Sequence, residues 1–288
     1  MKPEEVAAFF EQKEARNARK ATDSEIRVMS SNVLMCHMRK SADYSFVWLH
    51  RTMVLSGCYL HFRPDFLGLQ EADACMQSAI DQQLRAVYKK AEPVIPDLKN
   101  DCSCYTWNHT PIYYDRSKWR LRFCKWDAID ESCWSYTWGY YQSLEDPALE
   151  VIHLNFHPSP WGGERLRANM AAVNAELKRL RAAYPETPVF VTGDFNCQRE
   201  WEQFDVLVDG VNMESGCLLA REGDDCLQYT HANLGEMPTL RDGNTIDHIC
   251  VVRDLTDVKL YRVVCDELLI RASDHSPIFI DVTALKKA

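Results

Sequence analysis

The stretch that most constrains the fold runs from Pro188 to Cys197 and reads PVFVTGDFNC. Its first residues are mostly apolar and β-branched or aromatic, which is the composition of a buried strand. The Gly, Asp, Phe and Asn that follow mark the end of the strand, because Gly, Asp and Asn are common turn formers. Asp194 and Asn196 cannot both be buried there without partners, and open α/β sheets place their ligands at strand ends. Taken alone, the stretch is equally consistent with a strand-ending turn and with a ligand site.

The charge balance limits the class of partner. The chain has 288 residues, a net charge of -9 and 26% charged residues. Lys and Arg are too few for a strong nonspecific phosphate-binding surface, which argues against long duplex nucleic acid as the main partner. A metal-bridged phosphate substrate is still compatible with this balance, because a bound cation inverts the local field.

Cysteine usage and the N-terminus indicate a cytoplasmic protein. The 12 cysteines are scattered without a C-x-x-C pair, so zinc-site spacing is absent and buried free thiols are expected. The N-terminal segment 1–21 is predicted to be a charged helix (3–21) without the apolar core of a secretion signal. No apolar run approaches the ~18 residues of a membrane span. A reducing cytoplasm fits these features best.

The remaining periodicity predicts strands interleaved with helices. Further helices are expected at 43–61, 74–90, 165–183 and, in a short form, 199–208. Strands are expected at 26–34, 64–71, 149–156, 188–192, 245–252, 257–264 and 277–283, and residues 210–243 are expected to be rich in loops. Neither a repeat nor a linker interrupts the pattern. We therefore expect a single domain over 1–288 with a mixed-sheet α/β architecture.

Residues 102–145 are dense in Trp and Tyr, with an alternation that predicts several antiparallel strands. Such aromatic side chains could form a platform on which nucleic-acid bases stack. Core packing is the commoner use of alternating aromatic residues, and we favour it.

Polar side chains recur wherever an apolar strand meets a loop. The positions concerned carry acids, amides or imidazoles, and they are Asn32, Glu71, His153, Asn155, His157, Asp194, Asn196, Asp247, His248, Asp274 and His275. Any one of them could be satisfied by a neighbouring backbone group, but so many on one chain are hard to explain by chance. Carboxylate and amide oxygens suit Mg²⁺ or Mn²⁺, and histidines beside carboxylates suit proton transfer.

These positions lie in short motifs that, taken together, resemble the endonuclease/exonuclease/phosphatase superfamily. The motifs follow one another in that family's order, and they are SNVL (31–34), LQE (69–71), HLN (153–155), GDFN (193–196), IDHI (246–249) and SDHSP (273–277). They extend over nearly the whole chain. The combination is specific for the superfamily, but none of the motifs identifies a substrate.

The resemblance implies a four-layer α/β (mixed α+β) sandwich, with two packed mixed β-sheets flanked by helices and the site at one edge of the sheets. It implies a Mg²⁺- or Mn²⁺-dependent hydrolase acting on phosphoester bonds. In this family's pattern, Asn32 and Glu71 would hold the metal, with Asp274 near or on it. Catalytic roles would fall to five residues. His153 would lie near the leaving group, Asp194 would orient or deprotonate the attacking water, and Asn196 would fix the water or a phosphate oxygen. Asp247 would orient His275, which would contact the phosphate.

The sequence departs from the family pattern at its basic residues. Asp115 stands where a base often follows the segment HTPIYY, and Thr245 stands where an Arg often precedes Ile-Asp. Arg165 or Arg167 could supply the phosphate contact instead, although a solvated helix face is the more common role for either. His157 is a further possible phosphate contact, and His248 is expected to be structural.

We expect the substrate to be a phosphodiester or a phosphorylated small molecule. A nuclease or deadenylase acting on single-stranded nucleic acid is the alternative within the enzyme class, so nucleic acid is a possible partner. The alternative from another class is a catalytically inactive protein that binds a phosphate ligand with the same fold. A sphingomyelinase lacks support because no membrane segment is predicted, and an inositol-polyphosphate 5-phosphatase lacks support because its Pro-x-Trp-Cys-Asp-Arg signature is missing around Asp247. The sequence leaves the oligomeric state open.

Overall fold

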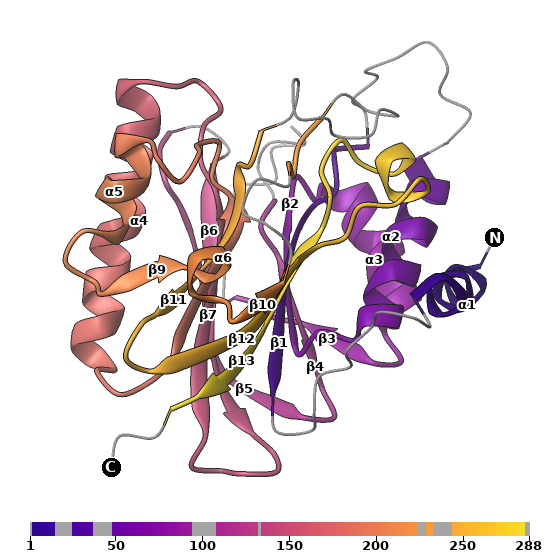
Figure 1. Cartoon of the computed structure of the whole chain (residues 1–288), viewed down its shortest axis with the longest axis horizontal. Coiled ribbons are helices and arrows are strands. Elements are labelled where there is room, and N and C mark those ends of the chain that lie inside the picture. The colour runs from indigo at the N-terminus through magenta and orange to yellow at the C-terminus, as the bar shows by residue number, and fades with distance from the viewer. Residues whose placement is uncertain are drawn as a thin grey trace.

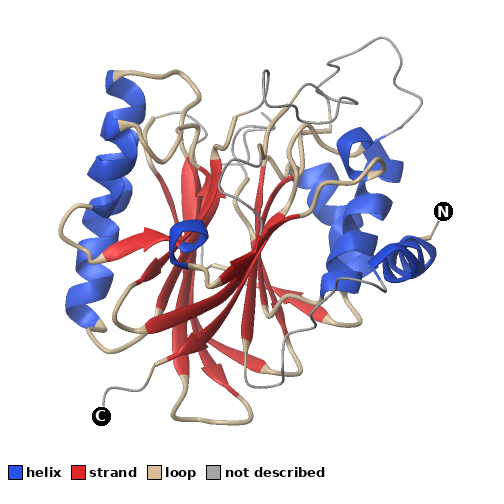
Figure 2. Cartoon of the chain, viewed as in Figure 1, coloured by secondary structure: helices blue, strands red, loops and turns tan. Residues whose placement is uncertain are grey.

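The computed structural model describes residues 2–14, 25–36, 48–93, 108–131, 134–223, 229–232 and 244–285. These segments form two β-sheets packed face to face, with helices on both outer faces (Figures 1 and 2). The four-layer sandwich predicted from the sequence is confirmed.

The first sheet, sheet A, has seven strands in the order β10-β12-β13-β1-β2-β4-β3. Their bounds are β1 Ile26–Asn32, β2 Phe66–Gln70, β3 Tyr88–Lys90, β4 Ile112–Asp115, β10 Glu222–Gly223, β12 Thr256–Val263 and β13 Ile278–Ala284. Strand β1 is parallel to β2 on one side and antiparallel to β13 on the other, so sheet A is mixed.

The second sheet, sheet B, has six strands in the order β5-β6-β7-β8-β11-β9. Their bounds are β5 Trp119–Ala128, β6 Ser135–Ser143, β7 Glu150–His157, β8 Val189–Asp194, β9 Met213–Ser215 and β11 Asp247–Val252. Sheet B is mixed as well, because β7 and β8 are parallel whereas β8 and β11 are antiparallel.

Helices α2 (Trp48–Phe62) and α3 (Ala74–Leu84) cover the outer face of sheet A, and α1 (Pro3–Glu14) packs against α2 on the outside. Helices α4 (Glu164–Ala183) and α5 (Glu202–Val208) cover the outer face of sheet B. Two short elements complete the chain, α6 (Gly216–Leu219) and the 3-10 turn η1 (Leu269–Arg271). None of the helices that the structure describes is long and apolar enough to cross a membrane.

The period of two along each strand divides its side chains between an outer core and the layer between the sheets. In β8, Val189 and Val191 pack under α4 and α5, whereas Phe190 lies between the sheets. In β1, Val28 lies between the sheets, whereas Met29 packs under the helices of sheet A. Asp194 has the parity of Phe190, and Asn32 has the parity of Val28. The alternation therefore directs both polar residues toward the layer between the sheets.

Two sequence predictions differ from the structure. The helix predicted over 74–90 ends at Leu84, and Tyr88–Lys90 instead forms the edge strand β3, because it pairs with β4. The region 210–243, predicted as loop, contains β9, α6 and β10 in its described part. Residues 15–21 of the predicted N-terminal helix, and 43–47 of the next one, lie outside the described residues.

The aromatic residues of 102–145 mostly serve the core, as favoured from the sequence. Tyr113, Tyr136, Trp138 and Tyr141 are buried. Trp107 lies outside the described part of the chain. Trp134 differs from the buried group, because it is half-buried and its ring lies edge-on against His157, with the ring centroids 4.9 Å apart.

Candidate active site

Three adjacent strands of sheet B bring His157, Asp194 and Asp247 together. Asp247 pairs with Asp194 across β11 and β8, and β7 aligns Phe156 with Gly193 in parallel register. His157 therefore ends β7 beside Asp194 at the end of β8. His157 Nε2 lies 3.4 Å from Asp194 Oδ2.

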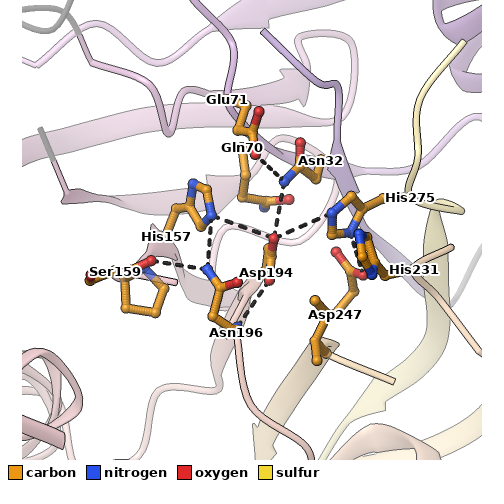
Figure 3. A network of polar contacts seen from close by, with 12 residues as sticks. Asn32, Gln70, Glu71, His157, Ser159, Asp194, Asn196, His231, Asp247 and His275 are labelled. Carbon is orange, nitrogen blue, oxygen red and sulfur yellow. Dashed lines mark hydrogen bonds and ion pairs between the residues drawn. The ribbon is translucent and has the colours of Figure 1, made fainter. Parts of the chain in front are cut away.

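Sheet A contributes Asn32 and Glu71 from the ends of two parallel strands. Asn32 aligns with Gln70, and Glu71 follows directly. The Nδ2 group of Asn32 donates to Glu71 Oε1 and to Asp194 Oδ2, at 3.0 Å each. One amide therefore links carboxylates from both sheets, and Figure 3 shows Asp194 at the centre of this network.

The backbone at the site adopts uncommon conformations. Leu34, Glu71 and Asn196 have φ values of 54°, 57° and 52°, a region that non-glycine residues rarely occupy. Such conformations are maintained only where surrounding contacts fix them in place, and they cluster at functional sites. At Leu34 the contact is its N–H to Asn32 Oδ1 (3.0 Å), and at Asn196 it is its N–H to Asp194 Oδ1 (2.9 Å).

His275 reaches the cluster from the loop between η1 and β13. Its Nδ1 lies 2.8 Å from Asp247 Oδ2, which fixes the orientation of the ring and leaves Nε2 directed at Asp194 Oδ2, 3.6 Å away. Ser273 holds this loop to β1, because its hydroxyl donates to the Asn32 carbonyl oxygen at 2.7 Å and accepts from the His275 N–H at 3.2 Å.

Charges within the cluster shift the pKa values of its members. Burial lowers the pKa of His275, but the carboxylates of Asp247 and Asp194 outweigh it and raise this pKa to about 10. Burial alone would raise the pKa of Asp194, whereas His275 and His157 hold it well below its usual range. Burial opposes the charged form of His157 as well, but its hydrogen bond to Asp194 raises the pKa above the usual value.

The Asp247 carboxyl, by contrast, has a raised pKa because burial outweighs the stabilising charge of His275. Asp247 and His275 are 2.8 Å apart and both buried, so they titrate as a pair. At neutral pH the cluster therefore combines an ionised Asp194 with a proton shared within the His275–Asp247 pair.

The donor set fits a hard divalent cation. Glu71, His157 and Asp194 each offer a ligand atom within 4.8 Å of the others. Glu71 is half-buried and faces a recess of about 20 Å³ lined also by Met35, His109, Trp134 and His157. Two carboxylates that converge on one amide are the kind of oxygen ligands that Mg²⁺ or Mn²⁺ binds, and among the described residues no cysteine joins the group of Glu71, His157 and Asp194.

Asp274 belongs to a neighbouring cluster. It groups with His231 and His275, and its Oδ2 lies 3.9 Å from His231 Nε2. Among the described residues, the groups that could hold a metal do not place Asp274 with Glu71. The structure therefore groups Asp274 with His231 and His275, whereas the family pattern places it near the metal held by Asn32 and Glu71.

The structure does not bring His153, predicted as a catalytic residue, to the polar cluster. His153 lies in the middle of β7, where its Nε2 is 2.8 Å from Thr192 Oγ1 and its ring lies against Phe66. His157 lies four positions further along the strand, which corresponds to about 13 Å. Both histidines face the layer between the sheets, but only His157 reaches the end of the strand and the polar cluster.

The tentative assignment of Arg165 and Arg167 to a substrate phosphate is also not supported by their contacts. Arg165 Nη2 pairs with Asp130 at 3.2 Å, and Arg167 Nη1 pairs with Glu202 at 3.5 Å. Both side chains lie on α4 and are about half exposed (46% and 48%). They belong to the solvated helix face that the sequence offered as the other interpretation.

His231 and Trp134 at the site were not predicted from the sequence. The ring of His231 lies against that of His275, tilted by 48° with the centroids 4.6 Å apart, and residue 231 forms β-bridges with Asn244 and His275. The other site positions were predicted because each is a polar residue where an apolar strand meets a loop. His231 and Trp134 do not follow this pattern. His248, predicted to be structural, is buried and its Nε2 lies 2.9 Å from the Cys197 carbonyl oxygen.

Comparisons with known proteins agree with this geometry. The sequence model of the Endonuclease/Exonuclease/phosphatase family matches residues 29–275. A search of curated proteins gave no match.

Several solved structures share the fold. An endonuclease/exonuclease/phosphatase from Bacteroides vulgatus superimposes with a TM-score of 0.77 at 18% identity, covering 91% of this chain and 100% of that one. A mannosyl-6-phosphatase from Bacteroides thetaiotaomicron gives 0.75 at 19%, covering 89% and 99%. The human Nocturnin catalytic domain, with a bound sulfate anion, gives 0.69 at 18%, covering 92% and 96%.

Proposed function

This chain belongs to the endonuclease/exonuclease/phosphatase family, and on that premise we propose that it is a divalent-metal-dependent hydrolase that directs water onto the phosphorus of a phosphoester. The observation that carries the proposal is the convergence of Asn32 and Glu71 from sheet A, Asp194 and Asp247 from sheet B, and His275 from the loop before β13. The substrate that we propose is a phosphodiester or a phosphorylated small molecule.

Glu71 and Asn32 would hold Mg²⁺ or Mn²⁺. When bound, such a cation neutralises phosphoryl oxygens and stabilises charge on the leaving oxygen. The N–H groups of Leu34 and Met35 orient the two ligand side chains, donating to Asn32 Oδ1 at 3.0 Å and to Glu71 Oε2 at 3.2 Å. The ligands are thus held in place before a cation arrives.

Asp194 would orient the attacking water. Its pKa is held low by His275 and His157 against the effect of burial, so it is ionised and accepts a hydrogen bond from water, but it is a weak base. A new P–O bond forms to the water oxygen as the bond to the leaving oxygen breaks. The water gives up one proton, and the leaving oxygen gains one.

His275 would contact the phosphoryl group through Nε2, with its charge supported by Asp247 at Nδ1. Asn196 donates from Nδ2 to the Pro158 carbonyl oxygen at 3.1 Å, and the same amide lies 3.1 Å from His157 Nε2. This contact with Asn196 supports a role for His157, rather than His153, beside the water or the leaving oxygen.

The experiment is hydrolysis of bis(p-nitrophenyl) phosphate with Mg²⁺ or Mn²⁺. We expect Glu71→Gln and Asp194→Asn each to lower turnover by about 10²-fold or more, since each removes a charge while keeping the shape of the side chain. The exposed Glu202→Gln is the matched control and should retain wild-type turnover. Chelation with EDTA should abolish hydrolysis, and added Mn²⁺ should restore it.

Wild-type rates in both site variants would contradict the proposal. Stabilisation by Mn²⁺ without hydrolysis of any member of a broad phosphoester panel would instead favour an inactive ligand-binding protein.

Two tryptophan side chains support single-stranded nucleic acid as a second candidate substrate. Trp134 lies against His157, and Trp161, four residues after His157 in the loop to α4, is 68% exposed. Aromatic side chains beside a phosphodiesterase centre can stack on bases. Under this alternative, Trp161→Ala should lower kcat/KM for a single-stranded oligonucleotide but leave hydrolysis of a phosphorylated sugar unchanged.

A further inference from the structure

A buried arginine lies behind the site. Arg51 is in the first turn of α2, and only 2% of it is exposed. A cation near a helix N-terminus is opposed by the helix dipole, and a buried guanidinium requires hydrogen-bond partners. Its position therefore depends on the groups that it contacts.

Those groups are backbone carbonyls of two loops that carry site residues. Nη1 donates to the carbonyl oxygens of Val33 (3.1 Å) and Ala272 (3.0 Å). Nη2 donates to those of Leu34 (2.9 Å) and Met35 (3.1 Å). One planar group thus joins the loop after β1 to the loop that precedes His275.

The same loops position the proposed catalytic groups through their other polar groups. The N–H groups of Leu34 and Met35 bind Asn32 and Glu71, as described above. On the other loop, Ser273 follows Ala272 and binds both the Asn32 carbonyl oxygen and the His275 N–H. A shift in either loop would therefore move a proposed metal ligand relative to His275.

We propose that Arg51 is a positioning residue that sets the separation between the Asn32–Glu71 pair and the His275–Asp247 pair. This inference rests on the proposed function, because the separation matters only if both pairs act on one phosphoryl group. Arg51 would not touch substrate. Its effect would pass through the four carbonyl groups that it holds.

Lysine cannot replace this arrangement. A guanidinium presents donors in a rigid planar fork, whereas an ammonium is a single point with three rotatable donors. Arg51→Lys keeps the charge but cannot reach carbonyls of both loops in the same geometry. Arg51→Ala leaves space into which free guanidinium ion could bind.

The matched control is Arg27→Lys. Arg27 is also buried (4% exposed), but it lies toward the other end of β1 from Asn32. Its Nε and Nη2 pair with Asp281 at 2.7 Å each. Both substitutions remove a buried guanidinium, but only that of Arg51 contacts the loops that carry site residues.

The experiment measures Mn²⁺ binding by electron paramagnetic resonance, together with hydrolysis of bis(p-nitrophenyl) phosphate. We expect Arg51→Lys to raise the Kd for Mn²⁺ by about 10- to 100-fold and to lower kcat, as loss of a group that supports metal ligands does. Arg27→Lys should leave both values within about twofold of wild type in the folded fraction. Guanidinium chloride at low millimolar concentration should partly restore Mn²⁺ binding to Arg51→Ala.

The possible outcomes distinguish failure of the role of Arg51 from failure of the proposed function. An active wild type, with unchanged Mn²⁺ affinity and kcat in Arg51→Lys, would overturn the role of Arg51 alone. A wild type that neither binds Mn²⁺ nor hydrolyses the ester would overturn the proposed function and this inference with it. An equal loss of Mn²⁺ affinity in Arg27→Lys would show that Arg51 acts through general stability.

Discussion

At the residue scale, position along a strand decides the role of a histidine. His153 and His157 lie on the same strand and face the same layer, yet only His157 contacts Asp194. The sequence HLNFH offers two imidazoles of equal chemistry, and the family pattern suggested a catalytic role for His153 and only a possible phosphate contact for His157. The register of β7 on β8 makes the distinction, and that register depends on contacts between segments distant in sequence.

The first prediction separates the two histidines by activity. His157→Asn should lower kcat/KM for bis(p-nitrophenyl) phosphate by about 10²-fold, because it removes the imidazole beside the proposed water. His153→Asn should keep kcat within about twofold, because this ring contacts Thr192 and Phe66 inside the sandwich. Greater loss of activity in folded His153→Asn than in His157→Asn would contradict the assignment.

The second prediction concerns acid stability. Burial lowers the pKa of His153 to about 3. In the unfolded chain His153 has an ordinary pKa near 6.5. Between that pH and about 3, its imidazole is protonated in the unfolded chain but neutral in the folded one. His153 therefore destabilises the fold as the pH falls below about 6.5, by about 1.4 kcal/mol per pH unit until its folded pKa is reached.

Urea unfolding at pH 7 and pH 5 tests the sign of this pH dependence of the free energy of unfolding. The stability advantage of wild type over His153→Asn should shrink by about 1.4 kcal/mol for each unit of acidification below about pH 6. Because the comparison is between variants, other titrating groups cancel to first order. A constant difference between the two proteins would show that His153 does not titrate as its burial requires.

At the element scale, the sandwich depends on close approach of the two sheets beneath the site. Gly68 of β2 faces Asn155 and Thr192 of sheet B, and Gln70 Nε2 donates to Asn155 Oδ1 at 2.6 Å. Thr192 Oγ1 also donates to Asn155 Oδ1, at 3.1 Å. Polar residues thus continue from the site into the layer between the sheets, and a glycine leaves room for them.

The third prediction tests this contact. A Cβ at residue 68 would lie 2.3 Å from Thr192 Oγ1 and 2.7 Å from Asn155 Cγ, so Gly68→Ala forces the sheets or these side chains apart. We expect a loss of about 1–3 kcal/mol in the free energy of unfolding, measured with urea. Gly162→Ala is the control, because its Cβ would meet nothing within 4 Å. Equal stabilities for the two variants would argue against tight packing at Gly68.

Much of this architecture was predictable from local pattern, and the exceptions have physical causes. The strands β1, β2, β8 and β11 were predicted to within about two residues at either end, because their apolar runs are bounded by polar residues, which is a local signal. The strand β3 was read as helix because its partner β4 lies more than 20 residues away along the chain and contributes no local pattern. Arg51 gave no signal at all, because its partners are carbonyl groups up to 221 positions distant.

At the scale of the whole molecule, the apolar core encloses half of the eight described cysteines. Cys58, Cys124, Cys197 and Cys250 are buried, whereas Cys75 is exposed, and none of these five is in a disulfide. Burial raises the pKa of Cys197 to about 12 and raises that of Cys250 as well. The free thiols expected from the sequence are therefore present, and their reactivity should follow their depth.

The fourth prediction uses pulse alkylation with iodoacetamide followed by peptide mass spectrometry. Cys75 should label within the pulse, whereas Cys197 and Cys250 should label only at the rate of global unfolding. Labelling in urea provides the reference for full access. If Cys250 labels as fast as Cys75 in the native protein, the core of sheet B opens more readily than its packing indicates.

The pairing of β1 with β13 has a consequence for biosynthesis. Arg27 and Asp281, which join these strands, are 254 positions apart. At about 5–20 residues per second, a ribosome needs on the order of 13 to 50 s to deliver the second strand after the first. Throughout that interval one side of β1 lacks its neighbour, and a message truncated before Ile278 would release a polypeptide whose unpaired backbone is free to recruit another chain.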